Sequence, residues 1–208
     1  MQTEKGNIDL STREKILIVA ERLFIEKGYS NTSIRDVCKA AGVNIALINY
    51  YFTSKERLYK ELIKGKTSPI ISRLKSLCED KELSSKDKFF SLFNIYEEFY
   101  EQNSNLPQLL AREIVTNTDI SRWFHRNIVA KELQYIKKIF IEAQRDGVIT
   151  DRYNPIILMI FCLGAMMFIL AGSSMVDSSI GEEFTIKGST LEKIEIIKEL
   201  ILNGIIKR

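Results

Sequence analysis

The sequence predicts an all-α protein with a small N-terminal helical domain and a larger C-terminal one. Apolar residues recur every three or four positions along almost the whole chain, which is the spacing of one face of a helix. No long stretch alternates apolar and polar residues, and no Asn-Gly or Asp-Gly pair joins two such stretches as in a hairpin. The 208 residues are 45% hydrophobic and include three prolines, which favours packed helices over a disordered chain.

The first expected helix begins near Ser11 or Thr12 and ends at Gly28. Ser11 and Glu14 have the spacing of a capping box, in which each side chain satisfies the other residue's backbone amide. Apolar residues then lie on one face at helical spacing, and a glycine is a common helix stop. The apolar face consists of Ile16, Ala20, Leu23 and Phe24.

Residues 33–52 predict two short helices joined by a tight turn. Ser33 begins the first of them and Gly42 ends it, while Asn44 is placed to cap the second. Each helix is about two turns long, and a glycine lies where the chain must reverse. This is the spacing of a helix-turn-helix motif. Thr53 or Ser54 then begins a fourth helix that continues to about residue 65 or beyond.

Beyond Pro69 the expected helices are longer. Pro107 fits the first turn of a short helix and Pro155 opens a strongly apolar one. The remaining expected helices cover residues 70–78, 86–102, 119–145, 155–176 and 191–206, with a loop at 177–189.

The third helix combines an apolar anchor with an outward surface of unusual composition. Ile48 and Phe52 are four residues apart and can fill a small core together with Val43. The outward residues are then asparagine, tyrosine and small apolar groups. Asparagine can pair with adenine edges, alkyl groups can touch thymine methyls, and hydroxyl or ammonium groups can hold phosphates. Helix N-termini near residues 32–33 and 54–55 offer further phosphate donors. The predicted DNA contacts are Thr32, Ser33, Arg35, Asn44, Ile45, Ala46, Asn49, Tyr50, Tyr51 and Lys55.

Charge divides the chain at the same place. Residues 1–66 contain 12 Lys and Arg against 8 Asp and Glu, a net charge of +4. Residues 67–208 contain 18 against 19, a net charge of −1. The excess positive charge of the first segment favours an anionic partner there, although +4 also fits an ordinary solvated surface. We therefore expect domains at 1–66 and 67–208.

Residues 12–64 resemble the DNA-binding domain of the TetR family of bacterial repressors. The matching run is ILIVAERLFIEKGYSNTSIRDVCKAAGVNIALINYYFTSKERLYKELI, with its LF pair, its GY, the AAGV turn and the YYF-SKE-L stretch. Residues 44–46 and 48–49 depart from the family's usual pattern, so the base-reading surface is this protein's own. The resemblance implies a cytoplasmic homodimer that binds a roughly palindromic DNA operator and releases it when a small-molecule effector enters the C-terminal domain. Regulators that activate, or that respond to no ligand, stay open as alternatives.

Two aromatic clusters in the C-terminal part are candidates for an effector site. One is the stripe at residues 89–100 and the other is residues 123–125, which include the single histidine. Core packing explains most such aromatics, but an aromatic-lined pocket would suit a hydrophobic or planar effector. The predicted ligand contacts are Phe93, Tyr96, Tyr100, Trp123, His125, Met159 and Met166.

Residues 154–176 contain no charged residue and raise a membrane alternative. Their 23 positions could span a bilayer, which would make the chain a membrane-anchored DNA-binding protein. The flanks lack a basic cluster, however, and the last helix also has a strong apolar face. We therefore expect both helices to form a dimer core, a four-helix bundle from two chains, and we expect no membrane. The predicted interface residues are Ile160, Leu163, Met167, Ile194, Ile197 and Ile201.

Enzyme, cofactor and metal chemistry find no support in the sequence. Three cysteines (Cys38, Cys78 and Cys162) lie far apart, which predicts neither a disulfide framework nor a metal site and fits a reducing cytoplasm. There is no GxSxG motif and no glycine-rich phosphate loop, and the carboxylates at residues 97–101 are typical of a solvated helix face. The N-terminal residues lack the apolar core of a secretory signal. We expect no catalytic residues, no cofactor and no metal.

Overall fold

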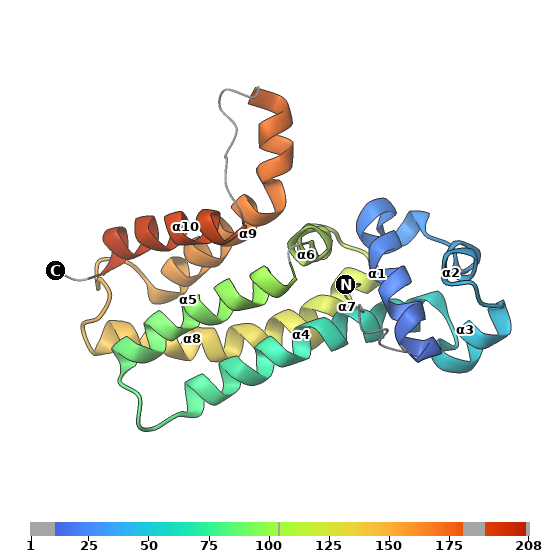
Figure 1. Ribbon diagram of the computed structural model, residues 1–208. Helices are drawn as coiled ribbons and strands as arrows, with labels where there is room; N and C mark the ends of the chain where they lie inside the picture. Colours follow the sequence, from blue (N-terminus) through green and yellow to red (C-terminus); the bar gives the residue numbers. More distant parts are fainter. Residues whose placement is uncertain (1–10, 104, 181–189, 207–208) are drawn as a thin grey trace, which may run out of the picture. The chain divides into compact units, whose positions relative to one another are not determined.

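A computed structural model describes residues 11–103, 105–180 and 190–206, without the side chains of residues 171–180, 190, 191, 193, 194 and 197. Within these ranges the regular elements are helices, and an isolated bridge pairs Ile149 with Ile206 (Figure 1). The chain divides into two compact units, residues 1–66 and 67–208. The all-α fold class is confirmed.

The first unit comprises α1 (Thr12–Asn31), α2 (Ile34–Ala41), α3 (Ile45–Phe52) and the beginning of α4 (Lys55–Glu79). Its core is built on aromatic rings: the Phe24 and Tyr59 centroids are 4.9 Å apart in an edge-on contact, and Tyr29 lies 4.9 Å from Tyr59. Each large side chain that is fully buried contributes about 1.5–3 kcal/mol to folding. The fully buried side chains here are Ile16, Ala20, Phe24, Val37, Ile48, Phe52, Leu58, Tyr59 and Ile63.

The start and the stop of α1 lie where the sequence predicts them. Ser11 Oγ accepts a hydrogen bond from the Glu14 amide, and the Glu14 carboxylate accepts one from the Ser11 amide, which completes the capping box. Gly28 has φ 81° and ψ 164°, so regular helical geometry ends there and a short turn carries the chain on to Asn31. Glycine adopts this positive φ without the steric cost of a side chain.

α4 differs from the prediction because it runs unbroken through Pro69. A proline inside a helix removes one hydrogen bond, and its ring crowds the carbonyl group four residues earlier. That carbonyl belongs to Gly65, the most conformationally adaptable residue type, and both residues are exposed to solvent. The helix can therefore bend locally at this position, and it continues to Glu79.

The second unit places α5 (Ser85–Gln102) between α8 (Ala130–Arg145) and α10 (Thr190–Ile205) (Figure 1). α9 (Pro155–Ile180) packs against α6 (Leu106–Val115), α8 and α10. The Phe89 ring of α5 lies 5.2 Å from Phe140 of α8 and 5.3 Å from Phe93, so the aromatic stripe of α5 is mainly core. The expected loop at 177–189 begins later than predicted, since α9 extends to Ile180, and residues 181–189 lie outside the described ranges.

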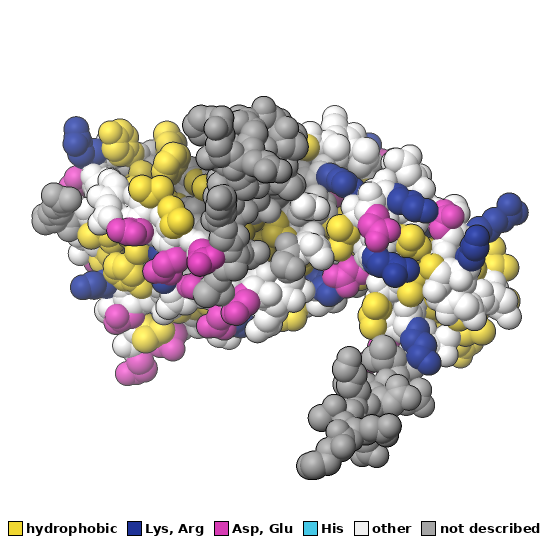
Figure 2. Space-filling model, turned by 45° about the horizontal axis from the view of Figure 1, so that its top comes forward, with side chains coloured by type: hydrophobic (Ala, Val, Ile, Leu, Met, Phe, Trp, Pro, Cys, Tyr) yellow, Lys and Arg dark blue, Asp and Glu magenta, His cyan; other side chains and the backbone are white. Residues whose placement is uncertain are grey.

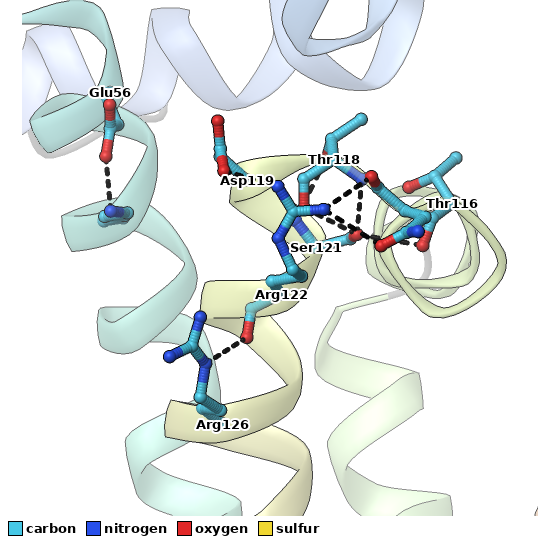
Figure 3. A network of polar contacts seen from close by, with 9 residues as sticks. Glu56, Thr116, Thr118, Asp119, Ser121, Arg122 and Arg126 are labelled. Carbon is cyan, nitrogen blue, oxygen red and sulfur yellow. Dashed lines mark hydrogen bonds and ion pairs between the residues drawn. The ribbon is translucent and has the colours of Figure 1, made fainter.

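The helix expected over residues 119–145 is divided into α7 (Asp119–Phe124), a π-helical segment η1 (His125–Val129) and α8. Thr118 and Ser121 form a capping box at the start of α7, and Ser121 Oγ also donates to the Thr116 carbonyl oxygen at 2.9 Å (Figure 3). A π-helical turn shifts the backbone hydrogen bonds by one residue, and here the Ala130 amide donates to the His125 carbonyl oxygen. The Arg122 carbonyl oxygen accepts from the His125 amide and also from Arg126 Nε at 3.3 Å (Figure 3).

Candidate nucleic-acid interface

Local hydrogen bonds fix the start of α2 and the turn between α2 and α3. At the start of α2, Ser33 Oγ accepts from the Asp36 amide at 3.1 Å and the Asp36 carboxylate accepts from the Ser33 amide at 2.8 Å. The hydrogen bonds from Ser33 lower the pKa of Asp36. Gly42 ends α2 at φ 67°, and Asn44 Oδ1 accepts from the Leu47 amide at 2.9 Å to begin α3. Local hydrogen bonds thus set the direction in which α3 leaves the turn.

α3 is anchored from one side. Ile48 and Phe52 are both fully buried, as the sequence predicts. The Arg13 guanidinium lies 5.2 Å from the centre of the Phe52 ring and forms an ion pair with Glu61 at 2.5 Å. The rotation of α3 about its own axis is therefore determined by buried contacts on its inner face.

The opposite side of α3 is exposed. Tyr50 is 80% exposed and Ile45 is 51% exposed, although residues of these types usually lose most of their surface on folding. Ala46 and Asn49 are also exposed, while Tyr51 is half-buried with its ring 5.1 Å from that of Tyr50. This outward surface has the composition expected from the sequence. Its contact with DNA stays a prediction.

The side chain of Thr32, one of the predicted DNA contacts, is used within the chain. Its side chain is 1% exposed, and Oγ1 donates to the carbonyl oxygens of Gly28 at 2.8 Å and Leu23 at 3.2 Å. The hydroxyl therefore closes the end of α1, and a phosphate contact near Thr32 through the backbone of the helix start stays a prediction.

Three other predicted DNA contacts also form hydrogen bonds within the chain. Ser33 and Asn44 use side-chain oxygens as helix caps but remain exposed. Lys55 Nζ donates to the Tyr29 carbonyl oxygen at 2.9 Å and lies 4.3 Å from the centre of the Tyr29 ring. An ammonium group has three donors and this bond uses one, so a phosphate contact by Lys55 stays a prediction. Arg35 is exposed on α2.

Thr53, which follows α3, was not predicted as a site residue. It has φ 61° and ψ −33°, a backbone conformation that is strained for a β-branched residue. Ser54 then accepts from the Arg57 amide at 3.1 Å and begins α4. No sequence signal marks such strain, because threonine is not a residue type that favours positive φ.

The residues predicted for an effector site are distributed over several helices of the second unit. Phe93, Tyr96 and Tyr100 of α5 and Met159 and Met166 of α9 are all buried. The Tyr96 and Tyr100 rings are stacked, with centroids 5.9 Å apart. Trp123 and His125 are half-buried, and His125 Nε2 lies 3.2 Å from the Ile114 carbonyl oxygen, so this ring nitrogen is already occupied.

Two further features of the second unit were missed. Glu132 of α8 accepts a hydrogen bond from the Tyr96 hydroxyl, which places a carboxylate beside two of the predicted residues. A surface groove of about 380 Å³ lies elsewhere and contains none of the predicted residues. It is lined by Ser72, Arg73, Ser76, Leu77, Asp80 and Ile95.

The predicted dimer residues differ in exposure. Ile160 is 60% exposed, and Leu163 and Met167 are half-buried. Ile201 is 4% exposed and packs inside its own chain, so the prediction is wrong for this residue. The side chains of Ile194 and Ile197 lie outside the described residues.

An apolar face nevertheless extends over α9 and α10. Hydrophobic side chains gather at the end of the second unit that carries α10 (Figure 2). The exposed members of this apolar face are Ile157, Ile160, Phe161 and Phe168 of α9 and Ile196 and Leu200 of α10. Among the described helices, none combines the length and the apolar character needed to cross a membrane.

Comparison with known proteins identifies the helix-turn-helix unit. Residues 16–62, from the second turn of α1 to the second turn of α4, match the family described as bacterial regulatory proteins, tetR family. These residues are a helix-turn-helix unit of the TetR family. The matched residues include the turn and all of α3, so the family match coincides with the exposed surface described above.

Relatives of known name share part of the chain, and the solved structures share its fold. It is 28% identical over 137 residues to the probable HTH-type transcriptional regulator YttP of Bacillus subtilis, and the match spans 64% of each chain. Among solved structures, the regulator FadR of Bacillus subtilis in complex with stearoyl-CoA has a TM-score of 0.71 at 20% identity, covering 92% of this chain and 98% of FadR. SmeT in complex with triclosan has a TM-score of 0.73 at 17% identity, covering 95% and 93%. At these identities the likeness of the solved structures establishes the fold over both units.

Proposed function

We propose that this protein is a TetR-family, ligand-responsive transcriptional repressor that binds a roughly palindromic operator as a homodimer. The observation that carries the proposal is the two-sided character of α3. Ile48 and Phe52 are fully buried, while Tyr50 and Ile45 on the same short helix are 80% and 51% exposed. A helix held this firmly by one face can present the other to the major groove in a defined orientation.

The exposed residues of α3 have the chemistry for reading bases. The Asn49 amide can pair with adenine, and the alkyl groups of Ile45 and Ala46 can contact thymine methyls. Tyr50 can donate its hydroxyl to a phosphate or a base edge. Ser33, Arg35 and Lys55 would contact the sugar–phosphate backbone and set the register of α3 on the duplex.

A homodimer is favoured by the length of α3 and by the apolar face of the second unit. α3 has eight residues and can read only a few base pairs, so a specific site needs two copies in successive major grooves about 34–36 Å apart. The apolar face of α9 and α10 would lose water on pairing with its own copy. Ile160 and Leu200, at 60% and 69% exposed, are the residues we expect at its centre.

The effector would bind among the helices of the second unit. FadR and SmeT were solved with stearoyl-CoA and triclosan respectively, so proteins of this fold accept molecules with apolar bodies. Here the buried residues Phe93, Met159 and Met166 can line such a site. An effector that prefers the dimer state in which the two α3 helices are wrongly spaced for DNA would lower the affinity for DNA. By linkage, DNA would lower the affinity for the effector by the same coupling free energy.

The proposal is tested by fluorescence anisotropy with DNA from upstream of the protein's own coding sequence. Unrelated DNA of equal length is the control, and two salt concentrations separate specific from electrostatic binding. We expect tight binding that prefers the upstream DNA, with two chains per site. Equal, weak binding to both DNAs that vanishes with salt would contradict the proposed function.

A further inference from the structure

Glu132 is a carboxylate placed among apolar elements without a cation. It lies on α8, whose neighbours at helical spacing, Ile136 and Ile139, are fully buried. Its hydrogen-bond donor is the Tyr96 hydroxyl of α5. Within the described residues, no Lys, Arg or His lies within 4.0 Å of its oxygens. Buried charges in proteins are usually paired, so an unpaired one indicates a functional role.

The same helix pair contains an ordinary buried charge for comparison. Lys88 of α5 is 8% exposed, and its ammonium lies 3.6 Å from the Glu142 carboxylate of α8 and 3.4 Å from the Cys78 carbonyl oxygen. The charge of Lys88 is thus paired within the chain. Glu132 lies more than two turns from Glu142 along α8, and its carboxylate has no such ion pair with the described residues.

The Tyr100 hydroxyl is a second polar group near Glu132. Glu132 as a whole residue is half-buried. Burial of its carboxyl group is the main reason that the pKa of Glu132 is raised. Tyr100 is 4% exposed, yet its hydroxyl forms no hydrogen bond with the described residues. Every fully enclosed polar side-chain atom of the described part has a hydrogen-bond partner, so the Tyr100 hydroxyl oxygen keeps some solvent-accessible surface. Burial and the charge of the nearby Glu132 carboxylate both raise the pKa of Tyr100, so the two groups lie close together.

We propose that Glu132, Tyr96 and Tyr100 form a subsite for the positively charged nitrogen of an amine or quaternary ammonium ligand with an apolar body. The carboxylate supplies the missing opposite charge, which is stronger in a site with little water. The stacked Tyr96 and Tyr100 rings, 5.9 Å apart, offer aromatic surface that attracts cations. The apolar body of the ligand would lie along the neighbouring hydrophobic side chains.

The subsite deepens the proposed function and rests on it for one point, namely that the bound cation is the effector. Glu132 then selects ligands by charge. An anionic or neutral molecule of the same shape would have to leave the carboxylate unpaired or protonated.

Isothermal titration calorimetry on the full chain tests the subsite with a matched pair of probes. The cation is naphthylmethyl-trimethylammonium, and its neutral isostere is neopentylnaphthalene, in which carbon replaces the charged nitrogen. We expect the cation to bind at least about tenfold more tightly than the isostere. Glu132→Gln should remove this difference, whereas Glu101→Gln, which changes an exposed carboxylate of α5, should leave it unchanged.

A second pair of variants keeps the test independent of the charge change. Tyr100→Phe retains the ring and should bind the cation nearly as tightly as the unaltered chain, while Tyr100→Leu should bind it several-fold more weakly. Circular dichroism confirms that each variant is folded. Unchanged cation affinity in Glu132→Gln, or no saturable cation binding up to about 1 mM in the unaltered chain, overturns the subsite.

Operator binding measured on the same preparation separates this inference from the proposed function. DNA binding without cation binding rejects the subsite alone. Cation binding that depends on Glu132, without specific DNA binding, rejects the regulator and leaves the subsite in place. Release of DNA by the cation but not by the isostere supports both, and cation binding that leaves DNA affinity unchanged rejects its role as the effector.

Discussion

Replacing Tyr50 by Ala separates DNA recognition from folding on a single short helix. Tyr50 is 80% exposed, and its ring contact is the edge-on one with Tyr51 at 5.1 Å. Losing an exposed contact of this kind should change the free energy of unfolding by no more than about 0.5 kcal/mol. One good contact to DNA is worth about 1–3 kcal/mol, and a symmetric dimer makes it twice. We therefore expect operator affinity to fall by about 2–6 kcal/mol, which is roughly 30-fold to 10⁴-fold.

Anisotropy titrations of operator DNA, paired with urea denaturation of the same samples, measure both quantities. Tyr153→Ala is the matched control, because Tyr153 is 56% exposed and lies in the second unit. Ile48→Ala is the opposite control, since a fully buried Ile should cost about 2–5 kcal/mol of folding stability. If Tyr50→Ala kept operator affinity within a factor of about two, Tyr50 would not lie in the interface and the assignment of the α3 surface would be refuted.

Four other substitutions test separate parts of the structure. Leu200→Asp should yield monomers in sedimentation velocity, because an unpaired charge would be buried in the apolar interface. The control Ile141→Asp, on α8, should stay dimeric. A dimeric Leu200→Asp variant would reject the proposed interface. Thr53→Gly should raise the free energy of unfolding by about 1 kcal/mol, because glycine adopts the positive φ of this position without strain. A lower melting temperature of the variant would contradict the claim that Thr53 is strained. Thr32→Val should lower the free energy of unfolding, measured by urea denaturation, by about 1–3 kcal/mol, because two carbonyl groups lose a buried donor. The operator affinity of the folded variant should not change. Selective loss of DNA binding would show that the Thr32 hydroxyl contacts DNA. Glu132→Gln should stabilise the chain at neutral pH, because burial raises the pKa of the Glu132 carboxyl in the folded state above its value near 4.5 in the unfolded state. The stability of the unaltered chain should therefore decline as the pH rises from about 4.5 through the raised pKa. Equal urea midpoints of both proteins from acid to neutral pH would show that this carboxyl is not desolvated.

The first unit could be predicted in detail because its signals are local. Capping pairs at Ser11 and Ser33 and the glycine at position 42 act over three or four residues, and each forms the hydrogen bond or positive φ that its spacing predicts. The burial of Ile48 and Phe52 follows from their four-residue separation on one helix. Once these positions are fixed, the outward composition of α3 is a consequence of helical geometry.

Some predictions failed because the sequence pattern does not encode how helices pack or bend. Ile201 is buried by neighbouring helices whose positions a periodic pattern cannot give, so its spacing did not reveal that it packs inside its own chain. Helical periodicity hardly changes across the π-helical turn at 125–129, so the sequence pattern does not reveal it. Pro69 argued for a helix end that the carbonyl of Gly65 and exposure to solvent make unnecessary.

Glu132 shows what kind of signal a sequence does contain for a ligand subsite. Positions 132, 136, 139 and 143 share one face of α8, and the last three are fully buried. A carboxylate that continues an apolar stripe is therefore detectable, and the same test finds Lys88 on the buried stripe of α5. What the sequence could not decide is which of the two charges has a partner inside the chain. That depends on the side-by-side packing of α5 and α8, which brings Glu142 to Lys88 and leaves Glu132 with the hydroxyl of Tyr96. A buried charge on an apolar stripe thus becomes a candidate ligand contact only when the structure provides no opposite charge for it.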